Sequence, residues 1–551
     1  MRDGVKLSAD VYLPDASGQF PVLLVRTPYN KALPSEIKHG TRDVLYYVDH
    51  GYGVVMEDVR GRGDSEGIWH PFINDVVDGF DTVEWIAKQE WCNGKIGMLG
   101  GSYRGWVQWA AAKLNPPHLV TLVSTAAAGR WFKELPYYNG LISLGMLEWL
   151  HFTGGRLVQN VDLVNWNEVL RKLPLKSLDE YVGRINTVWR TWISHSKLDD
   201  YWLSILLSEE DFKKIDLPVL HITGWYDGDQ PGATYFYEGM MKYSPAKNDQ
   251  YLISGPWDHG GTRIPKRVLG GVDFGPEAVI DLNRIHLLWF DWRLKDDAKA
   301  EEKLKGFFEG KRALTFVMGE NRWAARDSWP PAGMRYVSWY LHSGGAANTL
   351  LGDGRLSLAK PSDEVADTFQ YDPNDPVISA VDFNFYSSKS VETPLDSRFI
   401  ERRDDVLVYT SDPLTEKVEV AGKPKMSLYA SSDRIDTDWI VLLSDVHPDG
   451  RSIMVDHGGL RARFRESFNR ETFLEPGNVY RFDFDLFLDT DVIFPVGHRI
   501  RLSVMSSLFP RFDRNPNDGL PIGDSSDFNV ATNRIYHEKI YPSALLLPTL
   551  Q

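Results

Sequence analysis

The chain has 551 residues, 43% hydrophobic and 25% charged, with a formal net charge of −15 at pH 7. A single core stops growing at about 250–300 residues, so we expect about two or three domains. The negative charge argues against nucleic acid or an anionic membrane surface as a partner. No stretch of about 18 apolar residues occurs, so we expect no membrane-spanning helix.

The chain contains a single cysteine, Cys92. One thiol cannot form an internal disulfide or a cysteine-based zinc site, and this usage is typical of a reducing compartment. The first residues, MRDGVKLSADVYLP, alternate like a strand and contain no apolar signal-peptide segment. We therefore expect a cytoplasmic protein, and a signal trimmed from upstream of Met1 stays an open alternative.

Residues 1–128 alternate short β-branched runs with amphipathic stretches. The runs FPVLLVRTPY, YGVVMEDVR and GKIGMLGGS are typical of buried strands, whereas DVVDGFDTVEWIAKQ has helical spacing. Strands that alternate with helices indicate a mostly parallel sheet covered by helices on its faces. This segment is the expected first part of an α/β core.

The pattern changes over residues 129–214 and returns over residues 215–330. The first of these segments has helical periodicity rich in Leu and Trp, as in YNGLISLGMLEWLHF. LPVLHITGWYD and DQYLISGPWDH then resume the pattern of buried parallel strands. The helical segment is thus an insertion, and we predict that it forms a cap over the carboxyl edge of the sheet.

Residues 331–551 contain short alternating strands, such as MRYVSWYLHS and YRFDFDLFLD, between turns of Gly, Asp, Asn and Pro. Closely spaced strands without helices between them predict an antiparallel sandwich of jelly-roll type. No internal repeat or long linker separates the three parts, so we expect them to pack as one body.

The stretch GGSYRG, residues 100–105, places Ser102 between the strand-like KIGMLG and the helix-like WVQWAAAKL. Strand, tight turn and helix is the geometry of a nucleophile elbow. The glycines would relieve crowding there, and the helix N-terminus would favour a developing anion. A serine that merely caps a helix produces the same local pattern, so the motif alone leaves both interpretations open.

The order of the next candidates favours catalysis. Asp227 follows one apolar run in LPVLHITGWYDG, and His259 follows the next in YLISGPWDHGG. A serine nucleophile needs a histidine to take its proton and an acid to hold that histidine, in this order along such a chain. Asp229 and Asp258 are alternative acids, with Asp258 ranked last because it adjoins His259. We expect His221, inside a strand, to be structural.

The elbow GGSYRG, the acid loop GWYDG, the histidine loop GPWDHG and the early VRTPYNK together resemble the cocaine-esterase-like hydrolases. These are related to X-Pro dipeptidyl peptidases and α-amino acid ester hydrolases. The resemblance extends to EDVRGRGDSEG and, near the C-terminus, to SSLFPRFDRNPN. It implies an α/β-hydrolase core with an inserted helical cap and a C-terminal all-β jelly-roll domain. A homodimer joined through the last domain is a further expectation.

Residue by residue, the resemblance implies that Ser102 is the nucleophile, His259 the general base and Asp227 its acid. It also implies an oxyanion hole formed by the Tyr29 hydroxyl and the backbone amide of Tyr103. The expected reaction is hydrolysis of a carboxylic ester through an acyl-enzyme intermediate. This chemistry requires no metal and no cofactor.

Substrate choice is the least determined property. Asp229 stands where α-amino acid ester hydrolases carry a second carboxylate for the substrate ammonium, and Glu134 is a candidate partner. Gln230 and Arg104 depart from the residues expected beside such a cluster, and a solvated or helix-capping role for both acids is the alternative. Trp131 is a candidate for the pocket wall, although we expect most tryptophans of the cap to pack in the core.

Three functional alternatives therefore remain: a serine carboxylesterase, a hydrolase of α-amino acyl esters or X-Pro amides, and a non-catalytic ligand-binding protein. The expected partner is a small-molecule ester or amide.

The glycines of GRGDSEG are spaced G-x-G-x-x-x-G, which is not the dinucleotide fingerprint, and no H-E-x-x-H zinc motif occurs.

Overall fold

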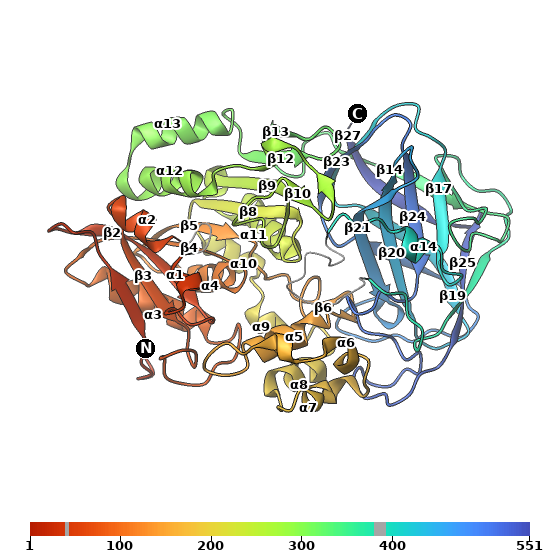
Figure 1. Cartoon of the computed structure of the whole chain (residues 1–551), viewed down its shortest axis with the longest axis horizontal. Coiled ribbons are helices and arrows are strands. Elements are labelled where there is room, and N and C mark those ends of the chain that lie inside the picture. Colours follow the sequence, from red (N-terminus) through yellow and green to blue (C-terminus); the bar gives the residue numbers. More distant parts are fainter. Residues whose placement is uncertain (39–42, 380–392, 551) are drawn as a thin grey trace.

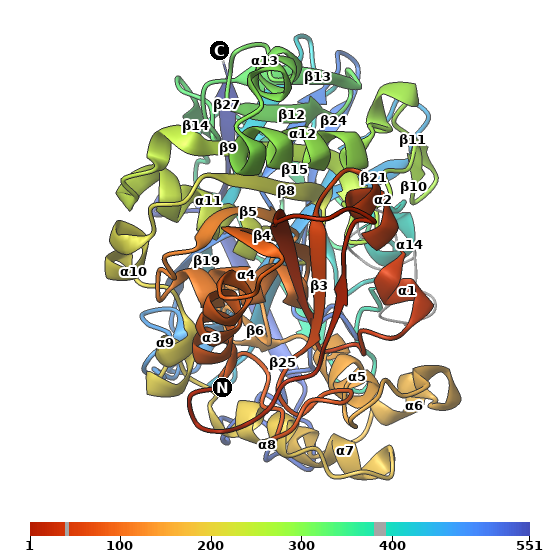
Figure 2. The same cartoon turned by 90° about the vertical axis from the view of Figure 1, so that its left-hand side faces the viewer.

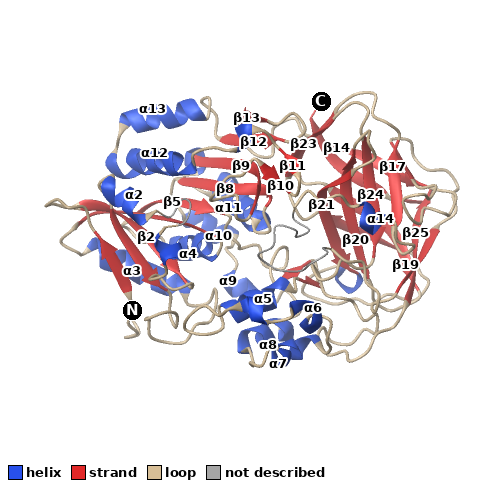
Figure 3. Cartoon of the chain, viewed as in Figure 1, coloured by secondary structure: helices blue, strands red, loops and turns tan. Residues whose placement is uncertain are grey.

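The computed structural model describes residues 1–38, 43–379 and 393–550. Figure 1 shows a half built of helices and strands beside an all-β half, with the inserted helices α5 to α8 at one edge of the molecule between them. Figure 3 shows that the long helices belong to the first half, whereas strands and loops dominate the second.

Within the described residues, the central sheet has the strand order β1-β3-β2-β4-β5-β8-β9-β12-β13. These strands are β1 (Ala9–Tyr12), β2 (Phe20–Thr27), β3 (Gly53–Asp58), β4 (Cys92–Gly101), β5 (Leu119–Thr125), β8 (Val219–Tyr226), β9 (Gln250–Asp258), β12 (Ala313–Val317) and β13 (Arg322–Arg326). Only β1 and β13, at the two edges, run antiparallel to their neighbours among these strands. The mostly parallel sheet predicted from the sequence is thus confirmed. Figure 2 shows the twist of this sheet, in which β3 and β8 run in clearly different directions.

Both faces of this sheet are covered because its strands are apolar on both sides. In β2, Val22 and Leu24 pack in one hydrophobic cluster, and Leu23 and Val25 pack in another, as the two-residue repeat of a strand requires. The first cluster includes side chains of α3 (Asp75–Ala87), α4 (Tyr103–Ala112) and α11 (Gln230–Tyr243). The second includes side chains of α2 (Val44–Asp49), α12 (Leu282–Lys295) and α13 (Ala298–Phe307).

The insertion between β5 and β8 is mainly helical. It contains the hairpin strands β6 (Tyr137–Tyr138) and β7 (Leu141–Ile142) and the helices α5 (Gly145–Phe152), α6 (Trp166–Val169), α7 (Leu178–Tyr181), α8 (Thr187–Ser194), α9 (Asp200–Ile205) and α10 (Glu209–Lys214). The insertion also contacts the all-β half: the Ile142 amide donates to Asp513 at 2.8 Å, and the Tyr138 hydroxyl donates to the Asp485 carbonyl at 2.6 Å.

The C-terminal half is one connected system of strands. The strands are β14 (Arg335–His342), β15 (Arg355–Ser357), β16 (Asp367–Tyr371), β17 (Leu407–Ser411), β18 (Val418–Gly422), β19 (Lys425–Ser432), β20 (Asp438–Val446), β21 (Ser452–Arg461), β22 (Tyr480–Asp485), β23 (Thr490–Phe494), β24 (Arg499–Met505), β25 (Ala531–Glu538), β26 (Tyr541–Pro542) and β27 (Ala544–Leu550). Among the described strands of this half, the pairing departs from the predicted antiparallel arrangement only between β15 and β17, which are parallel.

The two halves meet close to the loop that follows β8. Gln230, the first residue of α11, donates to the Asp489 carbonyl at 2.8 Å and accepts from the Asp489 amide at 2.6 Å. The all-β half thus helps to fix this loop.

Across residues 1–38, 43–379 and 393–550, the helices are all too short or too polar to cross a bilayer.

Candidate active site

Ser102 lies on the sharp turn between β4 and α4. Its backbone has φ 63° and ψ −131°, an unusual conformation for a residue other than glycine. The surroundings hold it there, because its amide donates to the carbonyls of Thr125 and Ala126, at the end of β5, at 3.1 and 2.8 Å. This geometry is that of a nucleophile elbow.

The glycines around Ser102 allow close packing of α4 on the sheet. A Cβ on Gly105 would lie 2.7 Å from the Cβ of Ala127. A Cβ on Gly100 would lie 2.7 Å from the Cβ of Arg104, and Gly100 also has φ +137°, which side chains rarely tolerate. The small residues are therefore a steric requirement of the elbow.

Asp227 and His259 meet at the carboxyl edge of two neighbouring parallel strands. Asp227 follows β8, His259 follows β9, and Asp227 Oδ1 lies 2.7 Å from His259 Nδ1. The other carboxylate oxygen accepts from Thr223 at 3.0 Å. Although burial acts to raise it, the pKa of Asp227 lies below its ordinary value because His259 and Arg263 stabilise the anion. An ionised, buried acid thus orients the imidazole.

Asp229 occupies the position between serine and histidine. The Ser102 hydroxyl donates to Asp229 Oδ2 at 3.3 Å, and that oxygen lies 3.8 Å from His259 Nδ1. Burial raises the pKa of Asp229 to about 6, and the nearby charge of Asp227 adds to this effect. The side chain is buried and makes no capping hydrogen bond to α11. The solvated or helix-capping alternative is therefore wrong for Asp229.

Arg263 contacts the His259 ring at Nε2, the nitrogen opposite the one that faces Asp227. No sequence motif pointed to Arg263 as a residue of the site. Arg263 Nη2 lies 3.4 Å from His259 Nε2, and Nη1 donates to the His259 carbonyl. The guanidinium rests against Gly101, where any Cβ would collide with it. An arginine four residues after a histidine is unremarkable in sequence, and only the folded loop brings it to the imidazole.

Tyr29 is placed to donate a hydrogen bond. Its oxygen accepts from the indole N–H of Trp149, on α5, at 3.2 Å, which leaves the hydroxyl proton free for another acceptor. Burial raises the pKa of Tyr29, so the hydroxyl keeps that proton. Trp149 is one of the cap tryptophans that the sequence places in the core, and its contact with Tyr29 adds a second role that only the fold shows.

The second predicted oxyanion donor is the backbone amide of Tyr103. As the first residue of α4, this amide is among those that an α-helix leaves without an intrahelical acceptor. The side chain is anchored elsewhere, because its hydroxyl donates to Asp75 at 2.6 Å. The helix N-terminus therefore points an available donor at the elbow.

Glu134 lies fully buried near Asp229. Its Oε2 accepts from the amides of Gly129 and Arg130 at 2.9 and 2.8 Å, whereas its Oε1 has no hydrogen-bond partner among the described residues. Burial, reinforced by the charge of Asp229, raises the pKa of Glu134 well above its ordinary value. The environment therefore favours the protonated acid, and the expectation of a solvated side chain is wrong here too.

Trp131 lies within an aromatic core. It is 2% exposed, and its ring centroid is 4.5 Å from that of Phe72 and 5.7 Å from that of Trp106. This packing is the role expected of most cap tryptophans, so a direct substrate contact by Trp131 stays a prediction.

The competing residues have structural contacts of their own. Asp258 accepts from the Gly261 amide at 2.6 Å and so shapes the loop that carries His259. His221 is buried within β8, where its Nε2 lies 3.0 Å from Gln250 Oε1.

Comparisons with known proteins agree with this architecture. Residues 3–261 match the X-Pro dipeptidyl-peptidase (S15) family, and residues 305–546 match the X-Pro dipeptidyl-peptidase C-terminal non-catalytic domain. Cocaine esterase of Rhodococcus sp. (strain MB1 Bresler) is 35% identical over 576 residues, covering 100% of this chain and 97% of the relative.

Two solved structures share the whole fold. An α-amino acid ester hydrolase is 26% identical with a TM-score of 0.86, covering 100% of this chain and 95% of the other. The same fold occurs in an aminopeptidase from a marine sediment Thaumarchaeota archaeon. It is 24% identical with a TM-score of 0.86, covering 100% of this chain and 95% of the other. The chain therefore belongs to the cocaine-esterase-like hydrolase family, which is related to the X-Pro dipeptidyl peptidases.

Proposed function

We propose that this protein is a serine carboxylesterase whose triad consists of Ser102, His259 and Asp227. The observation that carries the proposal is the contact of 2.7 Å between His259 Nδ1 and Asp227 Oδ1, at the sheet edge that also bears the Ser102 elbow. Membership of a serine-hydrolase family supports the same conclusion.

The reaction follows from these positions. The Ser102 oxygen attacks the ester carbonyl while His259 Nε2 takes its proton, and Asp227 stabilises the imidazolium through Nδ1. The tetrahedral oxyanion accepts hydrogen bonds from the Tyr29 hydroxyl and the Tyr103 amide. His259 then protonates the leaving alcohol, and a water activated by the same histidine releases the carboxylic acid from Ser102.

Aromatic surroundings favour simple aryl or alkyl esters. The Tyr29 ring lies 6.0 Å from the ring of Phe152, and Trp149 contacts its hydroxyl. Such a surface is suited to an apolar acyl or alcohol group. The Arg104 guanidinium lies 4.9 Å from the centroid of the Tyr29 ring and pairs with the buried Glu36 at 2.9 Å.

A second candidate, hydrolysis of α-amino acyl esters, is favoured by one observation. Asp229 is a buried carboxyl beside the nucleophile, and the buried Glu134 interacts with it electrostatically. Two carboxyls at this position could bind a substrate ammonium if Asp229 is ionised. The environment favours a protonated Glu134, which leaves only Asp229 to supply charge, so we rank this candidate second.

Hydrolysis of a small substrate panel separates the candidates. The panel contains p-nitrophenyl acetate and butyrate, an aryl benzoate, phenylglycine methyl ester and an X-Pro anilide, each tested with the wild type and Ser102→Ala. Turnover of simple esters that is lost in Ser102→Ala supports the carboxylesterase. Selective turnover of phenylglycine methyl ester or of the anilide supports α-amino acyl substrates. No turnover of any compound supports the ligand-binding alternative.

A further inference from the structure

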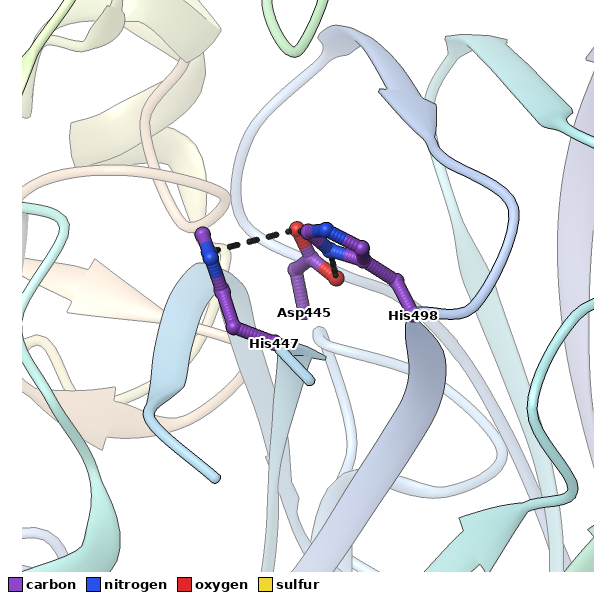
Figure 4. Close-up of side chains that lie close together, drawn as sticks. All are labelled: Asp445, His447 and His498. Atoms are coloured by element: carbon purple, nitrogen blue, oxygen red, sulfur yellow. Dashed lines mark hydrogen bonds and ion pairs between the residues drawn. The ribbon is translucent and has the colours of Figure 1, made fainter. Parts of the chain in front are cut away.

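Two histidines and an aspartate converge at one end of the all-β domain, outside the proposed active site. Asp445 lies near the end of β20, His447 begins the turn to β21, and His498 immediately precedes β24. Strands β20 and β24 are antiparallel neighbours, with Asp445 opposite Ile500. Figure 4 shows the His447 ring on one side of the Asp445 carboxylate and the His498 ring on the other.

The three side chains are close enough to share one ligand. His498 Nδ1 lies 2.9 and 3.0 Å from the two oxygens of Asp445, and His447 Nε2 lies 3.6 Å from Oδ2. One donor atom from each residue falls within 4.8 Å of the others. The side chains are 14–28% exposed, so an ion and a water ligand can reach them.

We propose that Asp445, His447 and His498 bind one divalent transition-metal ion of the zinc type. Two imidazole nitrogens and a carboxylate oxygen are a common ligand set for such ions, with a fourth position left for water. Ligand atoms about 2.0–2.2 Å from a tetrahedral ion lie roughly 3.3–3.6 Å from one another. The distance of 3.6 Å between His447 Nε2 and Asp445 Oδ2 fits this spacing, whereas His498 Nδ1, 2.9 Å from Asp445, must move slightly away from the carboxylate. Calcium or magnesium would prefer a set made entirely of oxygen atoms.

Tight turns hold two of the ligands in place. The Gly450 amide donates to the His447 carbonyl at 2.8 Å, and the His498 amide donates to the Pro495 carbonyl at 3.1 Å. A bound ion would therefore connect the β20–β21 turn to the β23–β24 turn. Arg451 Nη2 lies 3.5 Å from His447 Nδ1, which is not the nitrogen that faces Asp445, and the Arg451 guanidinium pairs with Asp449 at 2.8 Å.

Zinc titration of the full chain after treatment with EDTA tests the site. We expect one Zn²⁺ per chain by calorimetry, and binding weakened at least about tenfold in His447→Ala and in His498→Ala. His118→Ala is the matched control, because His118 pairs with Glu84 at 2.9 Å on the surface but belongs to no cluster of three candidate metal ligands among the described residues. This control should bind like the wild type.

Thermal unfolding supplies an independent readout. Zn²⁺ should raise the melting temperature of the wild type and of His118→Ala, but not of His498→Ala, because an ion that binds only the folded state stabilises it. Unchanged esterase activity and unchanged melting in EDTA would show that the variants fold. Absence of Zn²⁺ binding in the wild type, or Zn²⁺ binding by both ligand variants as tight as that of the wild type, would overturn the proposal.

Discussion

The Ser102 hydroxyl donates to Asp229 at 3.3 Å, an acid outside the proposed triad. On the other side of the site, His259 Nε2 lies 3.4 Å from Arg263 Nη2. The proposed attack requires the serine hydroxyl to turn from Asp229 toward His259. Catalytic hydrogen bonds in free enzymes are often poorly aligned and tighten only when substrate binds. We therefore interpret this arrangement as the resting state of the site.

Asp227→Asn should lower kcat/KM for p-nitrophenyl acetate by about 10⁴-fold, because the amide would favour the wrong tautomer of His259. The matched variant is Asp258→Asn, which changes an acid whose carboxylate accepts a hydrogen bond from the Gly261 amide at 2.6 Å. It should retain activity within about tenfold of the wild type. A larger loss in Asp258→Asn than in Asp227→Asn would refute the assignment of the acid. Circular dichroism checks the fold of both.

Tyr29→Phe should reduce kcat by about 10²–10³-fold, because it removes one donor to the oxyanion. KM should change much less, since this hydrogen bond strengthens in the transition state. Trp149→Phe keeps an aromatic ring but removes the N–H that donates to the Tyr29 oxygen, so the Tyr29 hydroxyl remains and the effect on kcat should be smaller. Steady-state kinetics on one ester measures both. Equal kcat values for wild type and Tyr29→Phe would exclude Tyr29 from the oxyanion hole.

Asp229→Asn should change how stability depends on pH. Burial raises the folded-state pKa of Asp229 to about 6, above its ordinary value of 3.8, so the folded state binds this proton more tightly than the unfolded state. Between about pH 4 and 6, this group therefore makes the wild type less stable as pH rises. The variant lacks that contribution, so the melting temperature of the wild type minus that of the variant should fall as pH rises across this range. Parallel curves for the two proteins would contradict the shifted pKa.

Gly105→Ala should destabilise the fold by about 1–3 kcal/mol, because its new Cβ would overlap Ala127 in the packed elbow. Gly306→Ala is the matched control: it lies in α13 with no atom within 4 Å of the added Cβ. Alanine favours a helix, so this variant should be as stable as the wild type or more stable by up to about 1 kcal/mol. Urea unfolding measures both free energies, and an unaltered Gly105→Ala would refute the steric argument.

Much of the fold could be predicted from the sequence because the signals are local. Continuous apolar runs such as FPVLLV indicate strands buried on both faces, and β2 does divide its side chains between two clusters. Glycines beside Ser102 likewise indicate a crowded turn. The order of Ser102, Asp227 and His259 follows the strand order, so adjacent strands bring the last two together. The homodimer and the cap boundaries stay predictions.

Only the tertiary structure decided the remaining features of the site. The contacts of Ser102 with Asp229 and of Tyr29 with Trp149 join residues that are 127 and 120 positions apart. The proposed metal ligands Asp445 and His498 are 53 positions apart and share no motif. Burial also sets the pKa of Asp229, and a sequence pattern specifies burial only on average. Local chemistry thus determined the framework, whereas long-range packing determined which polar groups meet and which of them carry charge.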